Sequence, residues 1–131
     1  MRILIVEDEF SSRKVLEKFL GTYGRTDSVV DGDEAVESFA SAWEEKDPYD
    51  VVLMDIMMPK LDGQKALQQI RDFEKSKGIV GFGEVKVIMV TALDDPKNVV
   101  EAFYEGGANS YLVKPIEREK LDAELKNLGL I

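Results

Sequence analysis

Residues 3–8 read Ile-Leu-Ile-Val-Glu-Asp, and residues 51–55 repeat the pattern as Val-Val-Leu-Met-Asp, an apolar run that ends in acid. A third run, residues 85–90, reads Val-Lys-Val-Ile-Met-Val. Short runs rich in Val and Ile are typical of strands buried on both faces. The apolar parts of these runs, residues 3–6, 51–54 and 85–90, therefore predict the central strands of a parallel sheet. Residues 28–30 and 110–113, each close to turn residues, are weaker strand candidates.

Apolar residues recur three and four positions apart between these runs, which predicts one helix after each strand. The five groups are Val15, Leu16, Phe19 and Leu20; Ala35, Val36, Phe39 and Trp43; Ala66, Leu67 and Ile70; Val99, Val100 and Phe103; and Leu121, Leu125 and Leu128. Gly21 and Gly129 stand where helices should end, and Asp95-Pro96 where the fourth should begin. Five alternating β-α units indicate an α/β fold with helices on both faces of the sheet.

Composition limits the chemistry that the chain can perform. Its 131 residues suit one domain, and no apolar run approaches the roughly 20 residues of a membrane span. Cysteine and histidine are absent, so carboxylates, hydroxyls, lysine and a hard cation remain for chemistry. The net charge of −9 argues against unaided binding to nucleic acid or to a membrane. The N-terminus turns acidic too soon for a signal peptide, so a cytoplasmic protein is expected.

Residues able to carry chemistry stand where the predicted strands end. Glu7 and Asp8 follow the first strand, Asp55 the third, Thr91 the fourth and Lys114 the fifth. The carboxyl ends of parallel strands meet at one edge of the sheet, where such folds bind ligands. Clustered carboxylates need a cation, and all-oxygen ligands suit Mg²⁺. With a hydroxyl and an ammonium to hold phosphoryl oxygens, the set indicates Mg²⁺-assisted phosphoryl transfer to a carboxylate.

In order and spacing, these residues resemble a CheY-like response-regulator receiver domain from end to end. The motifs that carry the resemblance are Glu7-Asp8, Asp55 followed by Met58-Pro59 and Asp62-Gly63, Thr91-Ala92, and Lys114-Pro115. The resemblance implies a doubly wound (βα)5 flavodoxin-like fold, with a five-stranded parallel sheet of order 2-1-3-4-5. It also implies a single receiver domain over residues 1–131 with no output domain, and a cis peptide bond before Pro115.

The resemblance further assigns roles to residues. Asp55 would be the phosphoacceptor, and Thr91 and Lys114 would contact the phosphoryl oxygens. Thr91 and Tyr111 would form the conformational switch. The implied Mg²⁺ ligands are Asp8 directly, Glu7 mainly through water, Asp55, and the backbone carbonyl of Met57.

The function that the resemblance implies is that of a two-component response regulator, with only self-phosphorylation and self-dephosphorylation as activities. A sensor histidine kinase or a histidine phosphotransfer protein would supply the phosphoryl group. The face formed by the fourth helix, fifth strand and fifth helix, which includes Tyr104 and Tyr111, would bind a downstream partner, unless the phosphoryl group is relayed onward. A monomer, or a dimer weakly linked to phosphorylation, is expected.

Other classes of protein stay open at this point. A flavodoxin-like cofactor binder shares the topology, although acids at residues 7–9 would repel its phosphate, and a P-loop nucleotidase lacks its motif. A haloacid-dehalogenase-type phosphatase also uses a strand-end aspartate, but it needs a second aspartate where Met57 stands. A degenerate receiver that only binds protein is the third alternative, against which the intact acids, Thr91 and Lys114 argue. Taken singly, Asp55 could be a turn residue, Thr91 a strand residue and Lys114 a surface lysine.

Overall fold

The computed structural model describes residues 1–58, 62–92 and 107–131. Five parallel strands form one sheet in the order β2-β1-β3-β4-β5, which confirms the predicted topology. The strands are β1 (Arg2–Val6), β2 (Arg25–Val29), β3 (Val51–Asp55), β4 (Lys86–Thr91) and β5 (Ser110–Val113). The described helices are α1 (Phe10–Leu20), α2 (Gly32–Glu44), α3 (Gly63–Ser76) and α5 (Arg118–Asn127), with a 3-10 turn η1 (Gly81–Gly83) before β4.

Several predictions from the sequence fall outside the described residues. They are the fourth helix with Val99, Val100 and Phe103, its Asp95-Pro96 start, Pro59 of the loop after β3, and Tyr104 of the expected docking face. Within the described part of the chain, no helix is long and apolar enough to cross a membrane.

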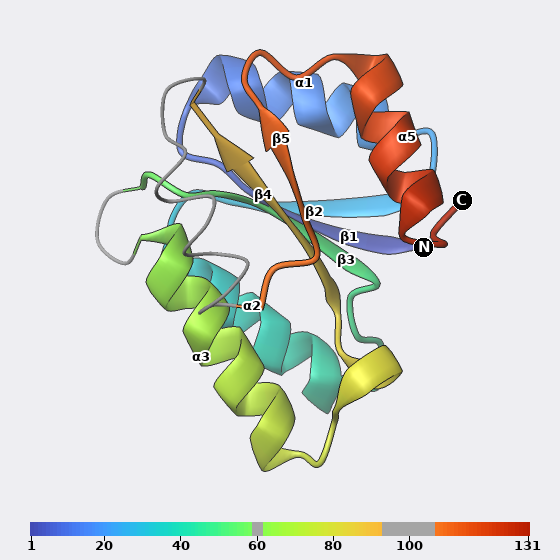
Figure 1. Ribbon diagram of the computed structural model, residues 1–131. Coiled ribbons are helices and arrows are strands. Elements are labelled where there is room, and N and C mark those ends of the chain that lie inside the picture. Colours follow the sequence, from blue (N-terminus) through green and yellow to red (C-terminus); the bar gives the residue numbers. More distant parts are fainter. Residues whose placement is uncertain (59–61, 93–106) are drawn as a thin grey trace.

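The helices cover the two faces of the sheet in pairs, α1 with α5 and α2 with α3 (Figure 1). Alternation along the strands explains this, because successive side chains of a strand point to opposite faces. In β1, Leu4 and Val6 pack in the core beneath α2 and α3, whereas Ile3 and Ile5 pack in the core beneath α1 and α5. All five residues of β3 are buried, as a central strand requires.

The boundaries of β2 differ from the prediction. We expected residues 28–30, but the strand is Arg25–Val29. It lies at the edge of the sheet and is polar; Asp27 accepts hydrogen bonds from the Arg2 guanidinium at 3.1 Å and from the Tyr49 hydroxyl at 2.8 Å. The N–H of Val30 instead donates to Glu34 at 2.9 Å, at the start of α2. The bounds of the strand follow its pairing with β1, from Arg2–Arg25 to Val6–Val29, and the contacts of Asp27 rather than apolar periodicity.

A side-chain cap begins α3, and glycines follow the last residues of α1 and α5. Asp62 accepts a hydrogen bond from Lys65 N at 2.9 Å and so begins α3 just after the loop that follows β3. Gly21 ends α1 as predicted, and Gly129 lies just past α5 with φ +76°, a conformation that favours glycine.

Candidate functional site

The hydrogen-bond pattern of the sheet continues into the loops at its carboxyl edge. Glu7 N donates to Val29 O at 3.1 Å, Ile56 N to Val90 O at 3.0 Å, and Lys114 N to Thr91 O at 2.9 Å. The first residues past three strands are therefore held almost as firmly as the strands themselves. The backbone from which the side chains of this edge project is therefore ordered by the sheet itself.

Three carboxylates converge at this edge. Glu7, Asp8 and Asp55 each offer an oxygen within 4.8 Å of the others'. Glu7 and Asp55 are buried, and Asp8 is exposed. Repulsion between two unit charges about 4 Å apart is roughly 4 kcal/mol at an effective dielectric of 20, so the cluster favours a bound cation. The structure thus brings together the three acids that the sequence predicts as metal ligands.

Lys114, just past β5, reaches into this cluster. Its Nζ atom lies 3.1 Å from Asp55 Oδ2 and 2.7 Å from Glu7 Oε1. Burial lowers the Lys114 pKa, but hydrogen bonds to Glu7 and Asp55 outweigh it and raise the pKa above its ordinary value. The ammonium is therefore charged at neutral pH. The Lys114-Pro115 peptide bond is cis, as predicted.

The Glu7 carboxyl group is buried, and its pKa is raised although the Lys114 ammonium lies close to it. Burial, and then its hydrogen bond to Asp55, raises the pKa of Glu7 from 4.5 to about 7. Its Oε1 atom is buried and accepts no hydrogen bond of good geometry from the described residues, although Lys114 lies close. A buried carboxylate oxygen with spare lone pairs suits a hard cation or a water bound to one. The donor set fits Mg²⁺ on this ground.

Both oxygens of Asp55 are held by donors. Met57 N donates to Oδ1 at 3.1 Å, and Lys114 Nζ donates to Oδ2 at 3.1 Å. Gly63, at the start of α3, packs against the backbone here, since a Cβ atom at this position would lie 2.4 Å from Asp55 O. The sequence motif includes a glycine because α3 begins against the phosphoacceptor candidate.

Thr91 and Tyr111 occupy neighbouring strands. Thr91 ends β4 and is 2% exposed; within the described part of the chain its hydroxyl makes one long hydrogen bond, 3.3 Å, to Ala92 O. Tyr111 pairs with Met89 in the register of β4 and β5, and its side chain is 44% exposed. The predicted switch residues are thus a buried hydroxyl and an outward-facing ring, two register positions apart.

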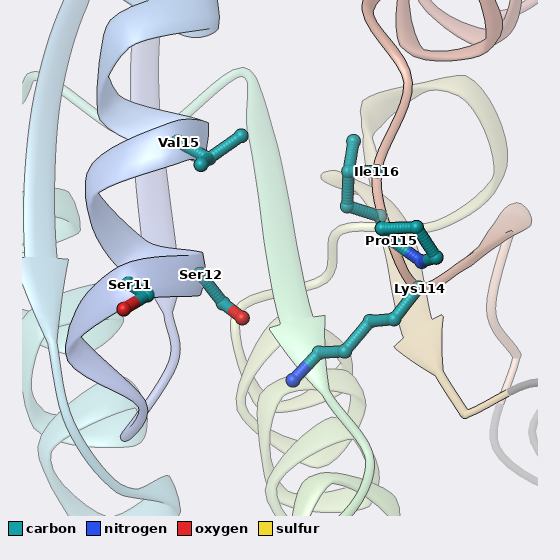
Figure 2. Close-up of a pocket in the computed structure, with 6 residues that line it drawn as sticks. All are labelled: Ser11, Ser12, Val15, Lys114, Pro115 and Ile116. Atoms are coloured by element: carbon teal, nitrogen blue, oxygen red, sulfur yellow. The ribbon is translucent and has the colours of Figure 1, made fainter.

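Beside the site lies a hollow that the sequence did not suggest. It measures about 170 Å³ and separates α1 from the segment after β5 (Figure 2). Its lining residues are Ser11, Ser12, Val15, Lys114, Pro115 and Ile116. Only Lys114-Pro115 of this set belongs to a sequence motif. Ser11 and Ser12 give no signal, because serines are common at the starts of helices.

Comparison with known proteins places the chain. The family described as the response regulator receiver domain matches residues 3–126. The chain belongs to this family. The receiver domain is a signalling domain of two-component systems. This chain has the sheet order and the acidic strand ends that are expected of a receiver.

Individual relatives agree with this assignment. This receiver is 34% identical to the chemotaxis protein CheY of Treponema pallidum over 92% of its own length and 76% of that protein. It is 38% identical to the probable transcriptional regulator ycf27 of Guillardia theta, over 95% of its length but only 44% of that protein. The chain therefore spans about half the length of the ycf27 relatives it matches.

Solved structures of receivers share the fold. In the complex of yeast Ypd1, a histidine phosphotransfer signaling protein, with the Ssk1 receiver domain, the matched chain has a TM-score of 0.84 and 30% identity, covering 98% of this chain and 88% of that one. In the CheX-CheY-BeF3-Mg²⁺ complex of Borrelia burgdorferi, the matched chain has a TM-score of 0.83 and 28% identity, covering 100% of this chain and 90% of that one.

Proposed function

We propose that Asp55 of this receiver accepts a phosphoryl group in a Mg²⁺-dependent reaction. The observation that supports the proposal most is the contact of Lys114 Nζ with Asp55 Oδ2, next to three carboxylates at the edge of the sheet. During phosphoryl transfer, negative charge on the phosphoryl oxygens must be stabilised next to the attacking carboxylate. The Lys114 ammonium lies at that position.

In the proposed reaction an oxygen of Asp55 attacks phosphorus and forms a P–O bond. The bond from phosphorus to the donor breaks, and its electron pair leaves with the donor, an imidazole nitrogen or the carboxylate of an acyl phosphate. Met57 N and Lys114 hold the two Asp55 oxygens, so the carboxylate is oriented before the donor arrives. The Thr91 hydroxyl, released from its long bond to Ala92 O, would donate to a phosphoryl oxygen.

Glu7, Asp8, Asp55 and the Met57 carbonyl would hold Mg²⁺, which when bound neutralises charge on the carboxylates and on the transferring phosphoryl group. Asp8 is exposed and therefore accessible to an entering ion. A charged Glu7 carboxylate would attract the ion more strongly than the neutral acid. Bound Mg²⁺ would therefore keep Glu7 unprotonated despite its raised pKa.

The donor in this proposal is a sensor histidine kinase or a histidine phosphotransfer protein, as the complex of the related Ssk1 receiver with Ypd1 suggests. The phosphorylated form would also lose its phosphoryl group to water, its only other activity.

We propose residues 1–131 as one receiver domain, with Tyr111 on the face that a downstream partner binds. A protein-binding module without phosphorylation is the competing function, and the same experiment separates the two.

Incubation with acetyl phosphate and Mg²⁺, followed by intact mass measurement, tests the proposal. Wild type should gain one phosphoryl group, and chelation of Mg²⁺ should stop the gain. Asp55→Asn should show none, because the substitution removes the nucleophilic oxygen at nearly constant volume. Asp50→Asn is the matched control, because Asp50 precedes the same strand and its carboxylate accepts a hydrogen bond from Arg2 N, at 2.8 Å, outside the cluster of three acids. Equal labelling of Asp55→Asn and wild type contradicts the proposal; no labelling of wild type supports the binding module.

A further inference from the structure

Arg13 lies near the start of α1 and contacts the backbone, rather than the side chains, of the acidic loop formed by residues 7–9. Its Nη1 atom donates to Glu7 O at 3.0 Å and, less favourably, to Asp8 O at 3.4 Å. Its own backbone N donates to Glu9 O at 3.0 Å. One residue thereby binds three successive carbonyl groups, those of the loop that carries two of the carboxylates at the site.

The Arg13 guanidinium has no carboxylate partner within 4.0 Å among the described residues. It lies instead over the Phe10 ring, 5.5 Å from its centroid. An arginine beside three consecutive acids would ordinarily form ion pairs with them. Here Nη1 donates to backbone carbonyls instead, so Arg13 forms no ion pair with Glu7 or Asp8 that would compete with a cation.

The remaining backbone contacts of the loop are few. Glu7 N donates to Val29 O at 3.1 Å, which fixes the start of the loop to β2. Glu9 N donates to Glu7 Oε2 at 3.3 Å, a long bond that depends on the Glu7 side chain itself. Glu9 begins α1 without a side-chain cap, although its carboxylate accepts from the Ser12 hydroxyl at 2.7 Å. The peptide planes after Glu7 and Asp8 therefore depend largely on Arg13.

We infer that Arg13 is a positioning residue for the proposed Mg²⁺ site: it fixes the peptide planes of Glu7 and Asp8 so that both carboxylates face the ion. The inference rests on the proposed function. Groups that orient metal ligands without touching the metal commonly change affinity by 10- to 100-fold when removed. Arg13 would play the same part by holding the backbone carbonyls of the two ligand residues.

Charge alone predicts the opposite result, which makes the inference testable. Removing a positive charge near a cation site should strengthen Mg²⁺ binding, because repulsion is lost. Loss of positioning should weaken it. Lys14 provides a charge-matched control: it is the next residue on α1, lies 5.4 Å from the centroid of the same Phe10 ring, and pairs with Glu17 at 3.5 Å rather than with the loop.

The experiment is calorimetric titration of Mg²⁺ into wild type, Arg13→Met, Arg13→Lys and Lys14→Met. We expect Arg13→Met to bind Mg²⁺ about 10-fold more weakly, Lys14→Met to bind equally or slightly more tightly, and Arg13→Lys, whose ammonium can also donate to carbonyls, to recover most of the affinity. An Arg13→Met variant that binds as tightly as Lys14→Met, or more tightly, overturns the inference.

A second measurement covers the case in which Arg13→Met is too unstable to titrate. Amide hydrogen exchange of the metal-free Arg13→Gln and Lys14→Met variants should then be faster than in wild type at Glu9 only in Arg13→Gln, because only that variant loses the guanidinium contacts with the loop carbonyls. Equal exchange in the two variants overturns the inference. If wild type itself binds no Mg²⁺, or if Asp8→Ala binds it as well as wild type, the proposed metal site fails. That outcome is distinguishable from a failure confined to Arg13.

Discussion

Lys114 and Asp55 lie 59 positions apart in the chain, yet Lys114 Nζ lies 3.1 Å from Asp55 Oδ2 at the edge of the sheet. The same ammonium lies 2.7 Å from Glu7 Oε1. One cation thus compensates two buried carboxylates. The same ammonium is close enough to contact a phosphoryl group on Asp55.

Lys114→Met should slow phosphorylation by acetyl phosphate while strengthening Mg²⁺ binding. Loss of a preorganised donor to a transferring group costs about 100-fold in rate, whereas removal of a positive charge from the acid cluster favours a cation. Rates from intact mass and affinities from calorimetry check the two effects separately. Lys120→Met, at an exposed lysine of α5 that lies 3.9 Å from Glu117, is the control and should change neither. A parallel loss of rate and affinity in Lys114→Met would contradict the assigned role.

Glu7 should make the metal-free protein less stable as pH rises. The folded state retains the Glu7 proton up to about pH 7, while the unfolded chain releases it near 4.5, so folding takes up a proton between these values. The contribution of Glu7 is fully present below pH 4.5 and is lost as pH rises through about 7. Denaturant unfolding of wild type and Glu7→Gln with chelator, from pH 4 to 8, should show this difference between them. A wild type whose stability relative to Glu7→Gln rises over this interval would refute it.

Asp8→Ala should weaken Mg²⁺ binding far more than Glu9→Ala. Both substitutions remove one negative charge from the same loop, so long-range attraction changes similarly. Only Asp8 belongs to the set of carboxylates within 4.8 Å of one another, whereas Glu9 accepts a hydrogen bond from the Ser12 hydroxyl. Calorimetric titration at pH 7.5 distinguishes them, and equal losses would mean that the site attracts the ion without Asp8 as a ligand.

Thr91→Ala should still be phosphorylated but should transmit the change poorly to β5. The bond of the buried Thr91 hydroxyl to Ala92 O is long, 3.3 Å, whereas a charge-assisted bond to a phosphoryl oxygen contributes about 1.5–3 kcal/mol. Its inward movement would leave room for the outward-facing Tyr111 to turn inward. NMR shifts of β5 amides with and without beryllofluoride, a phosphoryl mimic, check the coupling in wild type, Thr91→Ala and Thr91→Ser. If Thr91→Ala responds as fully as wild type, the switch uses another route.

The central strands and the edge strand β5 were predictable from the sequence, and the edge strand β2 less so. Runs of Val and Ile gave β1, β3 and β4 to within one residue at each end, because central strands of a parallel sheet bury both faces. The edge strand β2 was placed three residues too late at its start, because contacts of Asp27 with Arg2 and Tyr49 hold it. No local pattern encodes partners so distant in the chain.

The candidate site was predictable where it depends on strand ends. The rule that parallel strands share a carboxyl edge brings Glu7, Asp8 and Asp55 together, as the structure has them. It does not reveal that Lys114 bridges two of the acids, or that Arg13 binds the backbone of the loop. Those contacts depend on side-chain directions in three dimensions, which residue order alone does not fix.

Direct location of the phosphoryl group tests the central claim. Wild type treated with acetyl phosphate and Mg²⁺ would be reduced with borohydride, which converts an aspartyl phosphate into homoserine, and its peptides sequenced by mass spectrometry. We predict homoserine at position 55 and at no other aspartate, and none when Mg²⁺ is chelated. Homoserine at position 8 or elsewhere, with Asp55 unmodified, would contradict the assignment of Asp55 as the phosphoacceptor.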